Sequence, residues 1–335
     1  MGEAGPTGWS FHPSGKALLT YFPYITVALI PPSTQIARSA PPPRVTSRDY
    51  VWAAALIASG VPEIVCYQFG IPRGMWLSLG ELFVILGLAA LAAKLHPVKN
   101  LVGFILAVAA FKFGWDLAVP LIEASSLYQS ITSSLDWSRR FFLARAIRLI
   151  GALLMIVTLI GSGIGRRELF LMVGNWRAPV QPEPFLRFRR PVPWTRFAAA
   201  LLLIFGVALP MFLYFTLHPD LGRAHRLLPL LPLAIATSAM NAANEEFQFR
   251  SVLLARLKNI VSPREAVALT AVVFGVGHFF GQPSGWGGAL LAGIGAWALA
   301  KSMIETRGFT CAFATHFVQD MVIFAFLALS PAAAA

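Results

Sequence analysis

The sequence has little charge and almost no cysteine. Only 13% of its 335 residues are Asp, Glu, Lys or Arg, about half of the roughly 25% that is usual in soluble domains. Apolar residues make up 57%, which excludes a disordered chain because disorder requires the opposite balance. Both cysteines, Cys66 and Cys311, lie in apolar runs, so a disulfide framework is also excluded. With a mean hydropathy of +0.67, the chain is predicted to be a polytopic, all-α membrane helix bundle.

About nine transmembrane helices are predicted, and the length allows eight to ten. The predicted spans are 50–69, 76–95, 101–121, 141–164, 196–217, 227–254, 265–280, 286–303 and 309–330.

Four segments follow from this pattern. Residues 1–48 are interpreted as an N-terminal cytoplasmic or interfacial segment, because the apolar run at 17–30 is too short to span a ~30 Å hydrocarbon core. Front helices occupy 49–164. An Arg/Pro-rich cytoplasmic loop is predicted at 165–195, and the second set of helices, predicted to form the core, occupies 196–335.

Acidic residues are outnumbered by basic ones, 15 to 27. Nucleic acid is excluded as a partner, because the basic residues lie in short loops and no stretch interleaves them with aromatic residues. We expect contact with anionic lipid headgroups instead. With the N-terminus inside, the inside segments hold 19 Lys and Arg and the outside gaps five. The positive-inside rule then predicts a cytoplasmic N-terminus and an external C-terminus.

Ionisable residues inside membrane helices are costly and are candidates for function. The front spans contain six of them: Glu63, Glu81, Lys112, Asp116, Arg145 and Arg148. Lys112 and Asp116 are four residues apart and can pair on one helix face. Arg145 and Arg148 share a face and are expected to meet Glu63 or Glu81. Because such pairs account for all six, we interpret them as structural.

Three clusters in the second half carry more unusual chemistry. They are Asn241, Asn244, Glu245, Glu246, Gln248 and Arg250; Phe274 to His278; and His316 to Asp320. Glu246 and Arg250 have the spacing and order of a favourable ion pair, which leaves Glu245 without that partner. A spacing of four places the two end residues of each of the other clusters on one helix face.

The three clusters are predicted to lie at one depth. Glu245 precedes a hairpin turn near 259–263 by about 16 residues and His278 follows it by about 17, so antiparallel helices place them level. His316 enters from the same side, ~12 Å beyond Gly308. The three clusters would therefore meet near the midplane. Peptide hydrolysis requires an activated water, a general base and donors for the oxyanion, and two carboxylates and two imidazoles can supply these. No serine or cysteine nucleophile accompanies the histidines.

These motifs resemble the CAAX-protease and bacteriocin-processing family of intramembrane proteases, also called the Abi family. That family has EExxxR, FxxxH and HxxxN or HxxxD motifs on three helices. Here they stand as Glu245 to Arg250, Phe274 to His278, and His316 to Asp320, and the resemblance covers about 225–330.

The resemblance implies a catalytic role for each motif residue. It implies that Glu245 activates water, that Glu246 and Arg250 form a supporting pair, and that His278 also holds the water. His316 and Asp320 occupy the positions that stabilise the oxyanion. The resemblance also implies an endopeptidase in a bacterial plasma membrane that cleaves a peptide or membrane protein without a metal cofactor.

Asp320 departs from the prenyl-protein members, which have Asn at this position. An ionised carboxylate cannot donate to an oxyanion. Either Asp320 is neutral and donates, or it is charged and orients His316. The neutral form is the prediction, because the family accepts either residue.

Rival functions use the same residues. In a zinc-dependent protease, His278, His316 and Asp320 would bind the metal and Glu245 would be the base. In a transporter, the groups would relay protons. A non-enzymatic scaffold would retain them without turnover.

Overall fold

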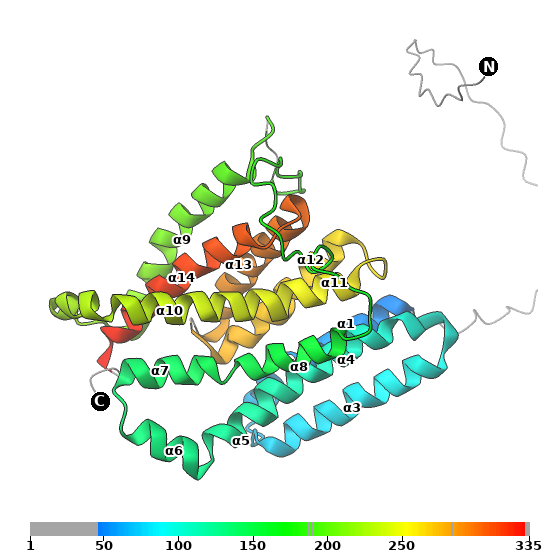
Figure 1. Cartoon of the computed structure of the whole chain (residues 1–335), viewed down its shortest axis with the longest axis horizontal. Coiled ribbons are helices and arrows are strands. Elements are labelled where there is room, and N and C mark those ends of the chain that lie inside the picture. The colour runs from blue at the N-terminus through cyan, green and yellow to red at the C-terminus, as the bar shows by residue number, and fades with distance from the viewer. Residues whose placement is uncertain (1–45, 187, 189, 283, 332–335) are drawn as a thin grey trace, which may run out of the picture. The chain divides into compact units, whose positions relative to one another are not determined.

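The computed structural model describes residues 46–331 except 187, 189 and 283. The apolar run at 17–30 and nearly all of the predicted N-terminal segment lie outside the described residues. Helices dominate the described part (Figure 1), and the prediction of a polytopic all-α bundle is confirmed.

The front helices are α1 (Ser47–Ala58), α2 (Val61–Gln68), α3 (Met75–Lys94), η1 (His96–Leu101), α4 (Val102–Phe113), η2 (Gly114–Ala118), α5 (Val119–Glu123), α6 (Ser126–Ser133), α7 (Trp137–Ala146) and α8 (Leu149–Leu159). The second set comprises α9 (Trp194–Leu217), η3 (Leu221–Arg226), α10 (Leu227–Glu246), η4 (Phe247–Val252), α11 (Leu253–Leu257), α12 (Pro263–Gly277), η5 (His278–Phe280), α13 (Gly285–Thr306) and α14 (Thr310–Ala328). Of the η elements, η2 and η4 are π-helical and the others are 3-10 helices.

Seven helical segments among the described residues are long and apolar enough to cross a membrane. The pair α1 and α2, bent by 56°, is an eighth candidate. The predicted span at 265–280 corresponds to α12, whose 15 residues reach only about 22 Å, short of a ~30 Å hydrocarbon core. The number of candidate spans is therefore seven or eight by this measure, and the orientation of the chain ends stays a prediction.

The hairpin turn predicted near 259–263 lies between α11 and α12. Asn259 has a left-handed φ of 66° and reverses the chain. Ser262 Oγ accepts a hydrogen bond of 3.2 Å from the Glu265 amide, and Pro263 occupies the first helical position. A serine cap followed by proline is a favourable helix start.

The helical segment Leu221–Leu257 connects the two halves of the bundle. Its α10 portion packs against α14 and also against α7, and it runs across the middle of Figure 1. α12 packs against α13, where a Cβ on Gly275 would lie 2.7 Å from the Ala289 carbonyl oxygen. Glycine at this position therefore permits the close approach that brings α12 into the bundle.

The loop at 165–195 is attached to the turn between α13 and α14. The Asn175 amide donates to the Thr306 carbonyl at 2.8 Å, and the Phe309 amide donates to that of Met172 at 2.8 Å. Trp194 Nε1 donates to Glu305 Oε2 at 2.9 Å. These bonds hold the start of α14, which carries the third motif.

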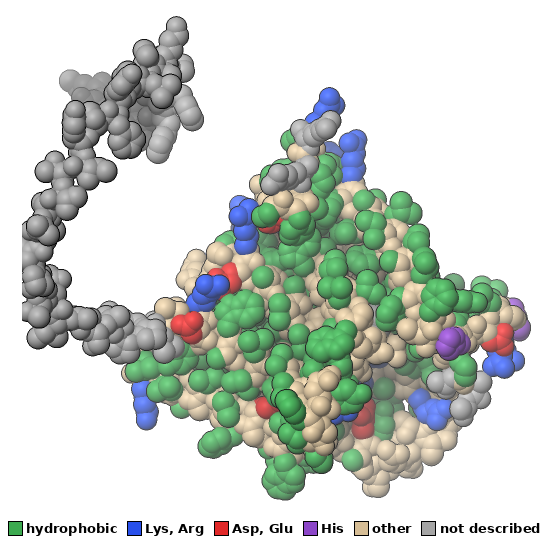
Figure 2. All heavy atoms as spheres, turned by 180° about the vertical axis from the view of Figure 1, so that it is seen from behind, with side chains coloured by type: hydrophobic (Ala, Val, Ile, Leu, Met, Phe, Trp, Pro, Cys, Tyr) green, Lys and Arg blue, Asp and Glu red, His purple; other side chains and the backbone are tan. Residues whose placement is uncertain are grey.

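Apolar side chains cover much of the outer surface. Trp76 is 86% exposed, Phe83 78% and Leu228 76%, and Figure 2 shows hydrophobic side chains spread over the face in view. Soluble monomers rarely expose apolar surface on this scale. The surface and the long apolar helices together indicate an integral membrane protein.

Lys112 is fully buried among three carboxylates of the front helices. Its Nζ lies 2.7 Å from Glu63 Oε1 and 2.7 Å from Asp116 Oδ2, and it also pairs with Glu81. The expected pairing with Asp116 is thus present.

The expected pairing of Arg145 or Arg148 with Glu63 or Glu81 is wrong for the described residues. Both glutamates pair with Lys112, and Arg148 lies 3.8 Å from Glu123 instead. Helix spacing identifies which residues share a face but not which neighbouring helix that face meets.

We predict that Lys112→Met destabilises the protein by ~3–5 kcal/mol, because it leaves the buried Glu81 and the partly buried Glu63 and Asp116 without their cation. Thermal unfolding in detergent measures the effect. Arg139→Met, which removes an exposed pair with Asp136, is the matched control and should unfold close to wild type. An equally stable Lys112→Met protein would contradict the structural role of the cluster.

Candidate active site

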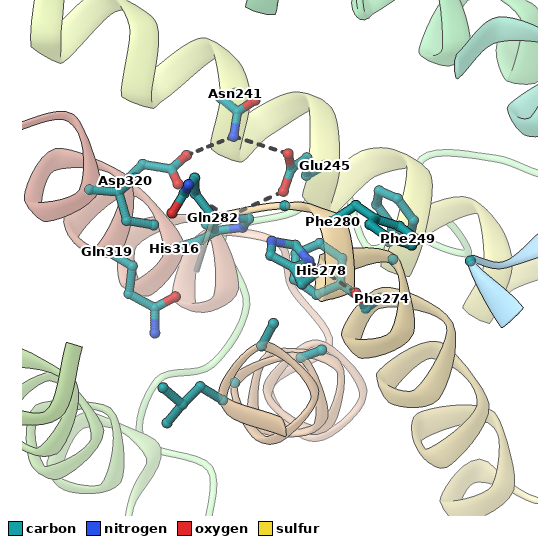
Figure 3. A pocket seen from close by; sticks show the side chains of 18 of the residues that line it. Asn241, Glu245, Phe249, Phe274, His278, Phe280, Gln282, His316, Gln319 and Asp320 are labelled. Atoms are coloured by element: carbon teal, nitrogen blue, oxygen red, sulfur yellow. Dashed lines mark hydrogen bonds and ion pairs between the residues drawn. The ribbon is translucent and has the colours of Figure 1, made fainter. Parts of the chain in front are cut away.

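The three motif clusters line one cavity of about 360 Å³. Glu245 reaches it from α10, His278 from the first residue of η5, and His316 from α14. Figure 3 shows these side chains pointing toward one space, with Asp320 beside His316. The structure therefore brings together the residues that helix spacing placed at one depth.

Glu246 is held away from the cavity by two partners. Its Oε1 lies 3.0 Å from Arg250 Nη1 and 2.7 Å from His316 Nδ1. Both Glu246 and Arg250 are fully buried, and the guanidinium carbon of Arg250 lies 3.9 Å from the centre of the Phe274 ring. A buried ion pair of this kind requires such complementary contacts. The motif's expected Glu246–Arg250 pair is present, and it also orients His316.

Glu245 faces the cavity and belongs to a second set of contacts. Asn241 Nδ2 donates to Glu245 Oε1 at 3.1 Å and to Asp320 Oδ2 at 3.0 Å. His316 Nε2 lies 3.5 Å from Glu245 Oε2 and 3.6 Å from Asp320 Oδ1. Both carboxylates therefore meet the same imidazole edge, and the Asn241 amide bridges them (Figure 3).

His278 presents one ring nitrogen to the site. Its Nδ1 lies 3.0 Å from the Phe274 carbonyl oxygen, which can only accept, so Nδ1 carries the hydrogen and Nε2 is left to accept one. The ring also packs on Phe274, with centroids 4.4 Å apart. These two contacts fix both the tautomer and the orientation of the imidazole.

Two polar members of the first cluster point elsewhere. Gln248 Nε2 donates to Asn244 Oδ1 at 2.7 Å, and Trp115 Nε1 donates to Gln248 Oε1 at 2.9 Å. Asn244 Nδ2 reaches the Arg148 carbonyl at 3.4 Å. These bonds attach α10 and η4 to the front helices rather than contributing to the cavity.

Several residues that line the cavity were not assigned to the site from the sequence, among them Asn241, Arg145, Glu63 and Asp116. Asn241 stands four residues before Glu245, a spacing that identifies the shared helix face. Arg145 was interpreted as a structural partner of a glutamate, but it lines the cavity from α7. The sequence offered one indication that Arg145 belongs to the site, namely its position inside a predicted membrane helix.

The residues proposed as zinc ligands do not form a compact three-ligand group in this structure. Within the described ranges, one group of three acidic or histidine side chains brings its ligand atoms within 4.8 Å of one another, and it consists of Glu63, Glu81 and Asp116. Lys112 Nζ already lies among these carboxylates. The ligand atoms of His278, His316 and Asp320 do not all lie within 4.8 Å of one another.

Comparison with known proteins places these motifs in a family. Residues 227–322 match the family model described as "Type II CAAX prenyl endopeptidase Rce1-like", which confirms the resemblance drawn from the motifs. No curated protein and no solved structure matches the chain significantly. The matched segment contains all three motifs, and it supports a membrane-embedded protease of this type.

Proposed function

We propose that this chain is an intramembrane endopeptidase of the CAAX prenyl protease and bacteriocin-processing type, in which Glu245 activates the water that hydrolyses a peptide bond. One observation carries the proposal: the two adjacent glutamates are divided between roles. Glu246 is bound by Arg250 and His316, whereas Glu245 lines the cavity. The substrate would be a peptide or a membrane protein whose cleaved segment enters this cavity.

The water is expected to lie between Glu245 and His278. The free Nε2 of His278 can accept one hydrogen from it, and Glu245 removes the proton as the water oxygen attacks the scissile carbonyl carbon. The C–N bond then breaks, and the proton held by Glu245 passes to the leaving amine. One peptide and one water thus give one acid and one amine.

His316 is positioned to stabilise the oxyanion. Its Nδ1 faces the Glu246 carboxylate, so an imidazolium would donate through Nδ1 to Glu246 and through Nε2 to the developing negative charge. Asp320 Oδ2 accepts from Asn241 and Oδ1 faces the same Nε2. This geometry favours a charged Asp320 that supports His316 over the neutral donor expected from the sequence.

We also propose that the protein lies in a bacterial plasma membrane with its N-terminus inside. The exposed Arg166 and Arg167 would then lie near the cytoplasmic headgroups, where each basic residue attracts anionic lipid.

We predict that Glu245→Gln lowers peptide cleavage by at least ~10²-fold, because the amide keeps the size of the side chain but cannot act as a base. Turnover of a library of apolar peptides, with and without prenyl groups, can be followed by mass spectrometry on purified protein. Glu168→Gln, in the exposed loop, is the control and should cleave normally. Near-normal turnover by a folded Glu245→Gln protein would rule out the proposed base.

We predict that cleavage needs no bound metal. Purified protein should contain less than stoichiometric zinc and keep its activity after strong chelation, because Glu245 and His278 supply the water-activating groups. Loss of activity on chelation that added zinc restores would favour the zinc-dependent alternative.

Exchanging Asn241 and Asp320 tests how the two carboxylates are held. Asn241→Asp places a third acid beside Glu245 and should reduce cleavage by ~10²-fold, whereas Asp320→Asn should reduce it at every pH by ~10-fold through loss of the negative partner of His316. The double variant restores one amide and one acid, so it should recover to within ~10-fold of wild type.

The same exchange can contradict this account. A double variant no better than Asn241→Asp would show that the bridge between the two carboxylates is not required. Activity of Asp320→Asn that persists and extends to higher pH would instead support a neutral Asp320 that donates to the oxyanion.

A further inference from the structure

Arg145 is the one lysine or arginine among the described residues that line the cavity. It lies within the candidate span Trp137–Leu159 and is partly buried. In the described part of the chain it has no acidic partner within ion-pair distance, and its guanidinium carbon instead lies 4.9 Å from the centre of the Phe141 ring. A guanidinium at membrane depth without a paired acid is costly, which makes it a candidate for function.

The packing of α7 on α10 places Arg145 beside the reacting groups. The two helices pack together and run in the same direction in Figure 1. Asn244 Nδ2 donates to the Arg148 carbonyl, which makes these two residues level. Arg148 lies just past the end of α7, and three residues before each member of this bond stand Arg145 on α7 and Asn241 on α10, whose amide holds Glu245 and Asp320. Arg145 and Asn241 both line the cavity.

The other charged groups around the cavity are mainly acidic. Glu63 and Asp116, which pair with Lys112, line it from the front helices, and Glu245 and Asp320 line it from α10 and α14. Among the described residues that line the cavity, Arg145 carries the one permanent positive charge, so an anionic ligand would be attracted to its guanidinium. Arginine binds carboxylates through two parallel N–H donors, a geometry that no other described side chain lining the cavity offers.

We propose that Arg145 is the subsite for a carboxylate of the substrate. The carboxylate is either the free C-terminus or an acidic side chain close to the cleaved bond. This inference rests on the proposed endopeptidase function and adds a condition on the substrate: the enzyme selects bonds that lie near a negative charge. Arg145 would then determine which bond enters the site, whereas Glu245 and His278 act on that bond.

Charge balance is the competing role for Arg145. It lines the same cavity as Glu245 and Asp320, so it could serve only to offset their negative charges. A balancing cation affects every substrate equally, whereas a carboxylate subsite affects acidic ligands alone. A comparison of acidic and neutral ligands therefore separates the two roles.

The test measures binding to the full-length Glu245→Gln protein, so it does not depend on turnover. Three labelled peptides share one apolar sequence: one ends in a free carboxylate, one in an amide, and one carries a single internal glutamate and ends in an amide. We expect at least one acidic peptide to bind ~10-fold or more tightly than the neutral amide, as a charged hydrogen-bonded pair would give. The acidic peptide that binds more tightly identifies the source of the carboxylate.

Adding Arg145→Gln to the Glu245→Gln protein should abolish this preference, because it lowers the affinity for the acidic peptide and leaves the affinity for the neutral amide unchanged. Arg145→Lys keeps the positive charge but lacks the paired donors, so it should retain part of the preference for the acidic peptide. This retained preference would show that the loss in Arg145→Gln does not come from misfolding. Arg140→Gln, on the exposed face of the same helix, is the matched control and should leave the preference unchanged.

Equal binding of acidic and neutral peptides, or an equal loss of affinity for all three peptides in Arg145→Gln, would overturn the proposal. Failure of hydrolysis in the wild type would leave this binding result standing, so the two failures can be told apart.

Discussion

The site depends on the buried contact between Glu246, Arg250 and His316. Successive residues on a helix point about 100° apart, so two adjacent glutamates cannot share a face. Glu246 meets Arg250 and His316 on the buried side, and Glu245 consequently faces the cavity. The same contact orients the imidazole that lies across from Glu245. Glu246 is therefore separated from Glu245 by its pair with Arg250, and its contact with His316 connects α10 with α14.

The front helices complete a site whose motifs all lie in the second half. The family match covers 227–322, yet Glu63, Asp116 and Arg145 from the front half line the same cavity. Lys112 neutralises part of that wall, and the bond between Trp115 and Gln248 ties it to η4. In the proposed function, the motif helices supply the reacting groups and the front helices supply Arg145, which would bind a carboxylate of the substrate.

Helix periodicity made the convergence of the motifs predictable, because residues four apart share a face and a hairpin sets relative depth. It could not identify partners between helices, so Lys112 rather than Arg145 or Arg148 meets Glu81. It also could not show that α12 ends at Gly277, where the chain enters η5. The bridging role of Asn241 could not be predicted for the same reason, because one of its two acceptors, Asp320, lies on another helix.

The central claim is that Glu245 removes a proton from water to cleave peptides within or next to the bilayer. Comparative proteomics of membrane peptides from cells that express the wild type or Glu245→Gln tests it most directly. We expect new peptide ends that depend on the wild-type protein and disappear with Glu245→Gln at equal protein abundance. The same set of peptide ends in both cells would contradict it.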